Sequence, residues 1–305
     1  MGSASMTIGL PAGLAVVMFG LGLSLAPRDF ARVLTQPKAV LVALVCQLLV
    51  LPAICFGLVL ALQLPPVLAV GMMVLAASPG GAAANLYSHL FRGDVALNIS
   101  LTAVNSVLAV LTLPLITNFA LWYFEPFDDR LGMQWAKAVE VFAIVLVPVV
   151  IGMLVRRGWP RFADRMDRPV RVVSVLVLIL VVAAAVASNW VLLRNNFLDL
   201  ALITIVFCLV SLSIGYVVPR WFRIGRRQAI STSFEIAMHN ATLAIVVAQT
   251  VLDSVALSLP AAVYGVLMFF LACGFGFLVR GRGGADAFAD DPVGRHHSPA
   301  DSAGS

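Results

Sequence analysis

The chain has 305 residues, of which 61% are hydrophobic and 11% are charged, against about 45–50% and about 25% in an average soluble domain. This composition excludes an ordinary soluble domain and predicts a helical membrane protein, because the apolar runs are long and lack the alternation of a transmembrane barrel. The net charge of +5 predicts an orientation in the lipid bilayer and no nucleic-acid partner, since the positive residues border the hydrophobic segments.

The two ends of the chain differ from the apolar part between them. Residues 1–6 (MGSASM) are interpreted as a cloning remnant or N-terminal extension. Residues 281–305 are rich in Gly, Ala, Asp and Ser and cannot bury a core, so they are predicted to form a disordered cytoplasmic tail. Residues 7–280 form one transmembrane domain, whose first apolar run is predicted to remain as a helix and not to be cleaved as a signal peptide.

Charge and proline clusters divide this domain into candidate membrane-spanning segments. In chain order the segments are 7–26, 38–62, 66–91, 95–123, 135–156, 169–192, 196–219, 228–252 and 255–279. The predicted fold class is therefore an all-α polytopic membrane protein with nine transmembrane helices.

The positive residues between these segments predict an orientation. When alternate loops are assigned to the same side, Arg130, Lys137 and Arg194 fall on one side and every other Lys and Arg falls on the opposite side. Loops rich in Lys and Arg stay in the cytoplasm. The sequence therefore predicts a multi-pass protein of the inner cell membrane, with its N-terminus outside and its C-terminus in the cytoplasm.

Two of the nine segments differ from the rest at their centres. The third carries residues 78–81 (SPGG), and proline followed by paired glycine interrupts a helix. The eighth carries Glu235. These two segments lie five apart and each is followed by one more segment. This pattern predicts an inverted repeat of a five-helix unit, with 7–123 as a first copy that lacks its opening helix and 135–280 as the second copy.

Glu235 needs an explanation because it is an acid within an apolar run. A carboxylate at that depth costs at least ~2.5 kcal/mol on insertion scales, and such residues usually face an ion or substrate path. The apolar runs offer no nearby basic residue as a salt-bridge partner. We therefore assign Glu235 a functional role.

Uncharged polar residues accompany this acid. Asn98, Thr102 and Asn105 recur at intervals of four and three residues and therefore share one helical face. Together with Asn85 and Glu235 they offer oxygen ligands that suit a hard cation such as sodium. The alternative is that the uncharged groups form interhelical hydrogen bonds, which are common for such residues in membranes.

Four segments also carry a family resemblance: GLGLSLAPRDFARVLTQPKAVLVAL, VCQLLVLP, SPGGAAANLYSHLFRGDVALNISLTAVNS and FEIAMHNATLA. They resemble signature segments of the bile acid:sodium symporter family, over nearly all of residues 7–280. The resemblance implies a core domain and a panel domain, two discontinuous helices that cross near the middle of the membrane, and two sodium sites beside the crossing. It is the nine-helix form of the family that the chain resembles.

The resemblance also implies ligands for one or two sodium ions. Those of the first site are Asn85, Asn98, Thr102 and Glu235, with Ala84 and Asn98 at positions where many relatives have serine. Those of the second site are Gln47, Glu235, the backbone oxygens of Ile236 and Met238, and His239. Relatives typically have glutamine at position 239. A neutral imidazole offers sodium a nitrogen lone pair, which is a poorer ligand, and it titrates near physiological pH.

Charge indicates the class of substrate. Two sodium ions beside the single carboxylate of Glu235 leave one surplus positive charge, which a monoanionic substrate would neutralise. The predicted cargo is a small organic anion, and the resemblance implies a bile acid, pyruvate or a pantoate-like acid. Asn240, Ala84 and Asn105 are the predicted contacts of this anion, and a helix is the alternative partner of Asn240.

The predicted function is sodium-coupled symport of this anion by alternating access, with no obligate protein partner. Two alternatives stay open. One keeps the fold but uses a single sodium ion or protons, because of His239; the other is a membrane sensor that binds an anion without moving it. An enzyme is not predicted, because the sequence contains no HExxH or GxSxG motif and no paired carboxylates within the membrane segments.

Overall fold

The computed structural model describes residues 34–124 and 135–280, together with residues 13, 15, 16, 18–20, 22 and 23. The helices of the two long ranges are α3 (Pro37–Val45), the π-helical turn η2 (Cys46–Val50), α4 (Leu51–Ala61), α5 (Pro66–Ala77), α6 (Ala82–Leu90), α7 (Val95–Phe124), α8 (Trp135–Gly158), α9 (Pro160–Ser188), α10 (Trp190–Asn195), α11 (Phe197–Trp221), α12 (Arg226–Ala237), α13 (Ala241–Val246), the π-helical turn η3 (Val247–Val251), the 3-10 turn η4 (Ala256–Ser258) and α14 (Leu259–Arg280). The predictions for residues 1–6, for most of segment 7–26 and for the tail 281–305 lie outside the described residues.

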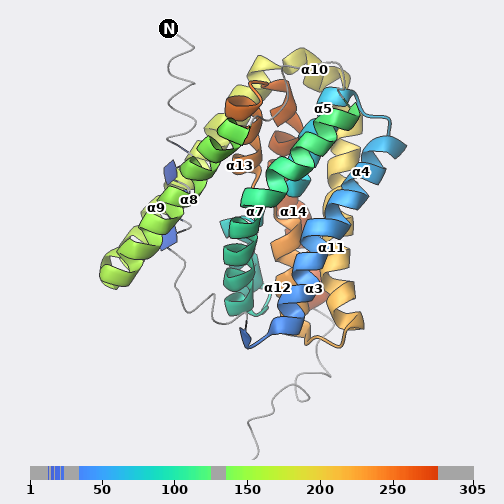
Figure 1. Cartoon of the computed structure of the whole chain (residues 1–305). Helices are drawn as coiled ribbons and strands as arrows, with labels where there is room; N and C mark the ends of the chain where they lie inside the picture. The colour runs from blue at the N-terminus through green and yellow to red at the C-terminus, as the bar shows by residue number, and fades with distance from the viewer. Residues whose placement is uncertain are drawn as a thin grey trace, which may run out of the picture.

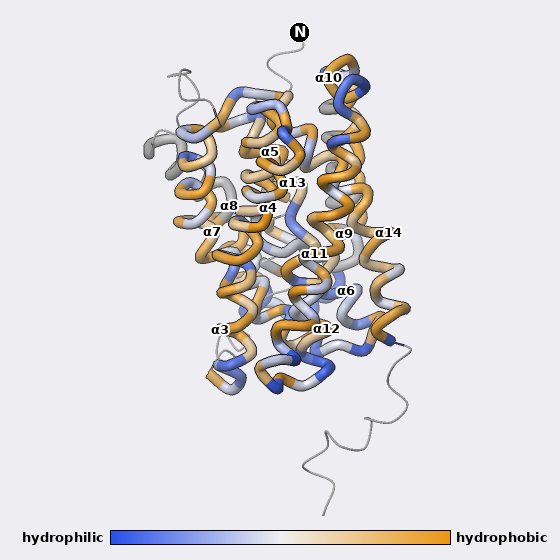
Figure 2. Tube along the Cα trace, turned by 90° about the vertical axis from the view of Figure 1, so that its right-hand side faces the viewer, coloured by the Kyte–Doolittle hydropathy of each residue, from blue (hydrophilic) through white to orange (hydrophobic). Residues whose placement is uncertain are grey.

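The described chain is an all-helical integral membrane protein. Pro37–Ala61, Phe197–Trp221 and Ala256–Arg280 are long and apolar enough to cross a membrane, and α7 adds a fourth candidate as a bent pair. Figure 2 shows hydrophobic residues along the length of the bundle and hydrophilic residues gathered towards its two ends. The predicted all-α class is confirmed for the described residues, and the total of nine spans stays a prediction.

The helix that contains most of the sixth segment begins before that segment does. The sequence predicts a start at residue 169 for the sixth segment, whereas α9 begins at Pro160 and ends at Ser188. Hydropathy detects the part of a helix that lies in apolar surroundings and misses the polar turns that precede it. Pro160 lies in the first turn, where proline is tolerated because its missing N–H would have no partner within the helix.

The helices α8 and α9 lie along one flank of the molecule (Figure 1). α8 contacts α9, α7 and η3, and α9 also contacts α14 and α13. The remaining helices pack around a continuous buried core, whose largest side chains include Tyr264, Phe207 and Phe234. The interrupted helices pass through the centre of this core.

The helix α7 is bent by 55° between Val95–Ala109 and Leu111–Phe124. Pro114 lies within it and cannot donate a hydrogen bond to the carbonyl of Val110, four residues earlier. Sharp bends in helices usually have such a cause. The half of α7 before the bend carries the polar face that the sequence predicts.

The first interrupted helix breaks between α5 and α6, at the predicted place. Ser78 has φ −71° and ψ 143°, the extended conformation that a proline imposes on the residue before it. The Ser78 hydroxyl donates to the carbonyl of Leu75 at 2.7 Å and so satisfies one of the carbonyls that a helix end leaves unpaired. Pro79 therefore determines where α5 ends.

A second interruption separates α12 from α13, and the two interruptions pair with each other. The N–H of Gly81 donates to the carbonyl of Met238 at 2.7 Å, and the N–H of Asn240 donates to the carbonyl of Pro79 at 2.8 Å. The pairing is antiparallel. It satisfies backbone groups that would be costly to leave unpaired in a bilayer. Each broken helix thus stabilises the other where residues 79–81 pair with residues 238–240, a place called the crossing below.

Contacts at one end of the bundle join several of the turns that the charge pattern assigns to the same side. Gln36 donates to Asp94 at 3.2 Å and accepts from Gln228 at 2.8 Å, which joins the starts of α3, α7 and α12. The guanidinium of Arg226 donates to the carbonyl of Val279, near the end of α14. These contacts agree with the predicted grouping, and the side of the membrane that this end faces stays a prediction.

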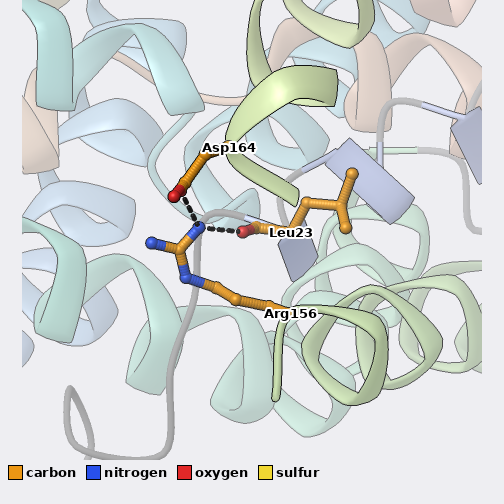
Figure 3. Close-up of polar contacts among 3 residues, drawn as sticks. All are labelled: Leu23, Arg156 and Asp164. Carbon is orange, nitrogen blue, oxygen red and sulfur yellow. Dashed lines mark hydrogen bonds and ion pairs between the residues drawn. The ribbon is translucent and has the colours of Figure 1, made fainter. Parts of the chain in front are cut away.

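The helices α8 and α9 are tied to the described N-terminal residues. Arg156 donates to the carbonyl of Leu23 at 2.8 Å and lies 3.4 Å from Oδ1 of Asp164 (Figure 3). Asp164 is largely exposed, so its ion pair contributes little stability. A Cβ at Gly152 would lie 2.4 Å from the carbonyl oxygen of Phe19, so only glycine allows the helices to approach this closely. These three elements therefore pack as one group.

We expect Gly80→Ala to destabilise the crossing. A Cβ at residue 80 would lie 2.3 Å from Oε1 of Glu235 and 2.7 Å from its backbone oxygen, and the paired backbones leave little room for adjustment. The melting temperature in detergent should fall clearly below that of the wild type.

Gly57→Ala is the matched control, because a Cβ at Gly57 in α4 meets no atom within 4 Å. Alanine is also favoured over glycine in a helix by about 1 kcal/mol, so this variant should be as stable as the wild type or more stable. Equal melting temperatures for the two variants would contradict the close packing at Gly80.

Candidate functional site

Glu235 lies in the last turn of α12 and is fully buried. The end of a helix carries the negative pole of its dipole, which is unfavourable for a carboxylate. Among the described side chains, the ion pair present joins Arg156 and Asp164 on the flank of the molecule, so no basic group there neutralises Glu235. Neutral donors, or a cation from solution, must therefore balance its charge.

Three side chains of α7 donate to this carboxylate. The Thr102 hydroxyl lies 2.6 Å and the Asn98 amide nitrogen 3.0 Å from Oε2, and the Asn105 amide nitrogen lies 3.4 Å from Oε1. All three side chains are buried. They approach from one face of α7, as their spacing predicts.

Side chains of α6 complete this first group. The Asn98 amide nitrogen also donates to Oδ1 of Asn85 at 2.8 Å, and the Ser88 hydroxyl donates to Oδ1 of Asn98 at 2.8 Å. Ala84 is buried on the same helix. The sequence interpretation missed Ser88. Its signal is its position three residues after Asn85, which places both on one face of α6.

A second polar group lies at the end of α5. Gln47 donates to the carbonyl of Ser78 at 3.1 Å, and Nδ1 of His239 lies 3.1 Å from the same oxygen. Because a carbonyl only accepts, Nδ1 carries the proton and Nε2 of the neutral ring carries the lone pair. The imidazole stacks on Phe207 with 5.5 Å between ring centroids and meets Tyr264 edge-on at 5.6 Å. Packing therefore fixes the ring.

The second group lies next to the first. His239 pairs with Gly80 in the antiparallel bridge, and Gly80 packs against the carboxylate of Glu235. Within the described part of the chain, however, this carboxylate makes no hydrogen bond to Gln47 or His239. The structure thus brings the predicted ligands into two adjacent groups, one around Glu235 and one around the carbonyl of Ser78.

The other predicted residues have mainly backbone or capping contacts. Ile236 is fully buried in α12, and the carbonyl of Met238 accepts from the N–H of Gly81. The side chain of Asn240 accepts from the N–H of Leu243 at 3.0 Å and so caps the start of α13. Asn240 thus has a capping role, and its contact with an anion stays a prediction.

Three buried acceptor atoms in these groups have no hydrogen-bond partner among the described residues: Oε1 of Gln47, Oδ1 of Asn105 and Nε2 of His239. Such atoms call for an ion, a water molecule or a ligand. Carboxylate, amide and hydroxyl oxygens are the ligands that hard cations take. The oxygen atoms of these side chains therefore fit sodium as ligands. They come from Glu235 and Asn105 in the first group and from Gln47 in the second.

The sequence also matches known proteins. The sequence model of the Sodium Bile acid symporter family matches residues 11–196. A rice protein described as "Probable sodium/metabolite cotransporter BASS2, chloroplastic" is 26% identical over 271 residues, which cover 89% of this chain and 64% of the rice protein.

Two further relatives come from a bacterium and a human. A Bacillus subtilis protein described as "Uncharacterized sodium-dependent transporter YocS" is 26% identical over 257 residues, covering 83% of this chain and 77% of that protein. A human protein described as "Sodium-dependent organic anion transporter" is 26% identical over 239 residues, covering 77% of this chain and 62% of that protein. The chain therefore spans less than two thirds of the length of the rice and human relatives.

We expect Thr102→Val and Thr117→Val to differ in stability, although both change a fully buried threonine of α7 to a residue of the same shape. The first removes the donor 2.6 Å from Glu235, and interhelical hydrogen bonds in membranes contribute about 0.6 to about 1.7 kcal/mol. The second removes a hydroxyl oxygen that has no hydrogen-bond partner in the described chain, so the free energy of unfolding should stay the same or rise.

Unfolding by denaturing detergent in a potassium buffer free of sodium would measure both. A loss of stability in Thr117→Val as large as that in Thr102→Val would show that the bond to Glu235 has no special weight.

Proposed function

The chain belongs to the sodium bile acid symporter family, and from this premise we propose that it is a secondary transporter that couples sodium entry to the uptake of a small organic anion. The resemblance inferred from the sequence is thereby confirmed at the level of the family. The proposal goes further, because it assigns residues, ions and a class of cargo to this chain.

The observation that carries the proposal is the setting of Glu235. It is a fully buried carboxylate at the crossing of two interrupted helices, with no basic neighbour among the described side chains. In transporters, discontinuous helices place ion sites near the middle of the membrane, and half-helix C-terminal ends face cations. The ends of α5 and α12 both lie at this crossing, so their dipoles favour a cation there.

We assign the cation ligands as two adjacent sets. The first comprises Asn85, Asn98, Thr102 and Glu235, and we add Asn105, because its amide oxygen is buried and has no partner in the described chain. The second comprises Gln47, His239, Glu235 and the backbone oxygens of Ile236 and Met238. Occupation of both sets would place two positive charges beside one carboxylate.

The cargo follows from this charge. An organic monoanion neutralises the surplus positive charge, and the half-helix beginning of α6 presents backbone N–H groups that favour an anion. The rice relative is described as a probable sodium/metabolite cotransporter and the human relative as an organic anion transporter, which supports the same class. Carboxylates such as pyruvate, a pantoate-like acid or a bile acid are the compounds to test.

Alternating access requires two bodies that move against each other. α8, α9 and the N-terminal residues pack together through Arg156, Leu23 and Gly152, and we assign them to the panel domain. The helices that bear the polar groups form the core domain. We place the end with Gln36, Asp94 and Gln228 in the cytoplasm, because its turns carry the positive residues.

We expect Glu235→Gln to abolish both the sodium-specific rise in melting temperature and the uptake driven by a sodium gradient. Glutamine keeps the size of the side chain and can accept from Thr102, but it lacks the negative charge that attracts a cation. The measurements are melting temperatures in sodium chloride against potassium chloride, and uptake of labelled carboxylates into vesicles containing the protein.

Asp199→Asn is the matched control, because it makes the same chemical change at an exposed position in the first turn of α11. It should behave as the wild type. A sodium response retained in Glu235→Gln would remove Glu235 from the site. A wild-type protein with no sodium-specific stabilisation would overturn the proposed coupling, and binding without accumulation would favour a sensor.

We expect His239→Gln to raise the apparent affinity for sodium. The amide offers an oxygen in place of the imidazole nitrogen, and sodium prefers oxygen. The imidazole of His239 donates to Ser78 through Nδ1 and has no oxygen to offer. The alternative mode of transport, with a single sodium ion or with protons, follows from this lack of an oxygen ligand. Sodium titrations followed by melting temperature, at acidic and at neutral pH, distinguish these modes. An unchanged sodium affinity and pH dependence would place His239 outside the cation site.

A further inference from the structure

The carboxylate of Glu235 is surrounded by groups that donate, although a cation needs groups that accept. The NH2 group of Asn98 donates to Oε2 of Glu235 at 3.0 Å and to Oδ1 of Asn85 at 2.8 Å. Thr102 donates to Oε2 at 2.6 Å. The NH2 group of Asn98 therefore joins two oxygen atoms that belong to the same proposed cation site.

The orientation of the Asn98 carboxamide is set by its neighbours. The Ser88 hydroxyl donates to Oδ1 of Asn98 at 2.8 Å, and both side chains are fully buried. A reversed carboxamide would turn Oδ1 towards the oxygens of Asn85 and Glu235. Three acceptors would then face each other in a buried site, which is costly unless a positive charge lies among them. The preferred orientation thus depends on the presence of a cation.

We propose that Asn98 is a reversible ligand, whose NH2 group joins Asn85 and Glu235 in one orientation and whose Oδ1 turns towards both when sodium is bound. Ser88 is the positioning residue of this reversal, because a hydroxyl can donate to Oδ1 in one orientation and accept from Nδ2 in the other. The inference rests on the proposed sodium site and describes how that site changes between its free and bound forms.

Thr102 has an alternative partner of the same kind. Its hydroxyl proton has two acceptors within reach, Oε2 of Glu235 at 2.6 Å and the carbonyl of Asn98 on its own helix at 3.0 Å. A hydroxyl carries a single proton, so donation to the carbonyl leaves its lone pairs free for a cation. Two side-chain rotations therefore convert a donor-lined site into an acceptor-lined one, and the backbones of α6 and α7 stay in place.

Nuclear magnetic resonance of the full-length protein tests the reversal directly. Asparagine labelled with nitrogen-15 in its side chain gives one signal for each NH2 group. Asn98→Asp identifies the signal of Asn98, because aspartate has no side-chain amide. Sodium chloride, but not potassium chloride, should shift this signal as the NH2 group moves from a carboxylate to a hydroxyl. The signal of Asn196, whose amide donates to the carbonyl of Leu192 outside the site, should stay unchanged.

The role of Ser88 is tested in the same spectra. Ser88→Ala removes the hydroxyl and should reduce the sodium-induced shift of the Asn98 signal, whereas Ser88→Thr keeps the hydroxyl and should restore it. An equal shift in Ser88→Ala and wild type would remove Ser88 from the mechanism.

A pair of acidic variants tests the energetic consequence. Asn98→Asp and Asn105→Asp each add a carboxylate to the same face of α7, close to Glu235. Both replacements remove an amide donor to Glu235, but only Asn98→Asp also removes the NH2 group that joins Glu235 to Asn85. Affinity for a hard cation rises with the charge of its ligands, and Asn98→Asp should gain about tenfold more sodium affinity than Asn105→Asp because no donor has to turn away.

The outcomes separate this inference from the function on which it rests. Two outcomes would overturn the reversal alone. One is an equal gain in sodium affinity in the two acidic variants; the other is an Asn98 signal that sodium does not shift although sodium still stabilises the protein. If sodium changes neither the melting temperature nor the spectra of the wild-type protein, both the reversal and the proposed transport function are overturned.

Discussion

A carboxylate that has no basic partner among the described residues, inside an apolar bundle, is the constraint on which the geometry of this protein depends. Glu235 cannot reach water, so neighbouring helices must supply its hydrogen bonds. The first half of α7 supplies them through Asn98 and Thr102. Gly80 has no side chain, and the carboxylate can therefore pack directly against the interruption between α5 and α6. In the proposed function, the same charge that makes burial of Glu235 costly would attract a cation.

The crossing keeps this arrangement rigid at a depth where broken helices are normally unfavourable. Two backbone hydrogen bonds, one in each direction between the interruptions, satisfy groups that would otherwise face hydrocarbon. The interruptions thus stabilise each other and bring the ends of α5 and α12 to one place. Rigidity matters because the side chains of a site can change partners in a defined way only if the helices that carry them stay in place.

The sequence predicts the parts of this site that depend on local chemistry. Proline sets the break after Ser78, and helical spacing places Asn98 and Thr102 on one face, both from positions in a single segment. The parts that depend on contacts between segments could not be predicted in this way. Ser88, on another helix, donates to the Asn98 carboxamide. Gln47 and His239 come together because both form a hydrogen bond with the carbonyl of Ser78. Helical spacing places Ser88 beside Asn85, but no pattern in the sequence indicates that Ser88 faces Asn98 or that Gln47 and His239 share an acceptor.

The two polar groups differ in how they can respond to a cation. Around Glu235, the amides and the hydroxyls can each turn to present an oxygen, so one set of side chains serves the free and the bound form. Around Ser78, the Gln47 amide can also turn, but the ring of His239 is held between Phe207 and Tyr264 and offers nitrogen in any orientation. A rotation therefore cannot make the second group equivalent to the first. If the proposed sites are occupied, His239 is therefore the residue at which the ion coupling of this chain would differ from that of a protein with glutamine there.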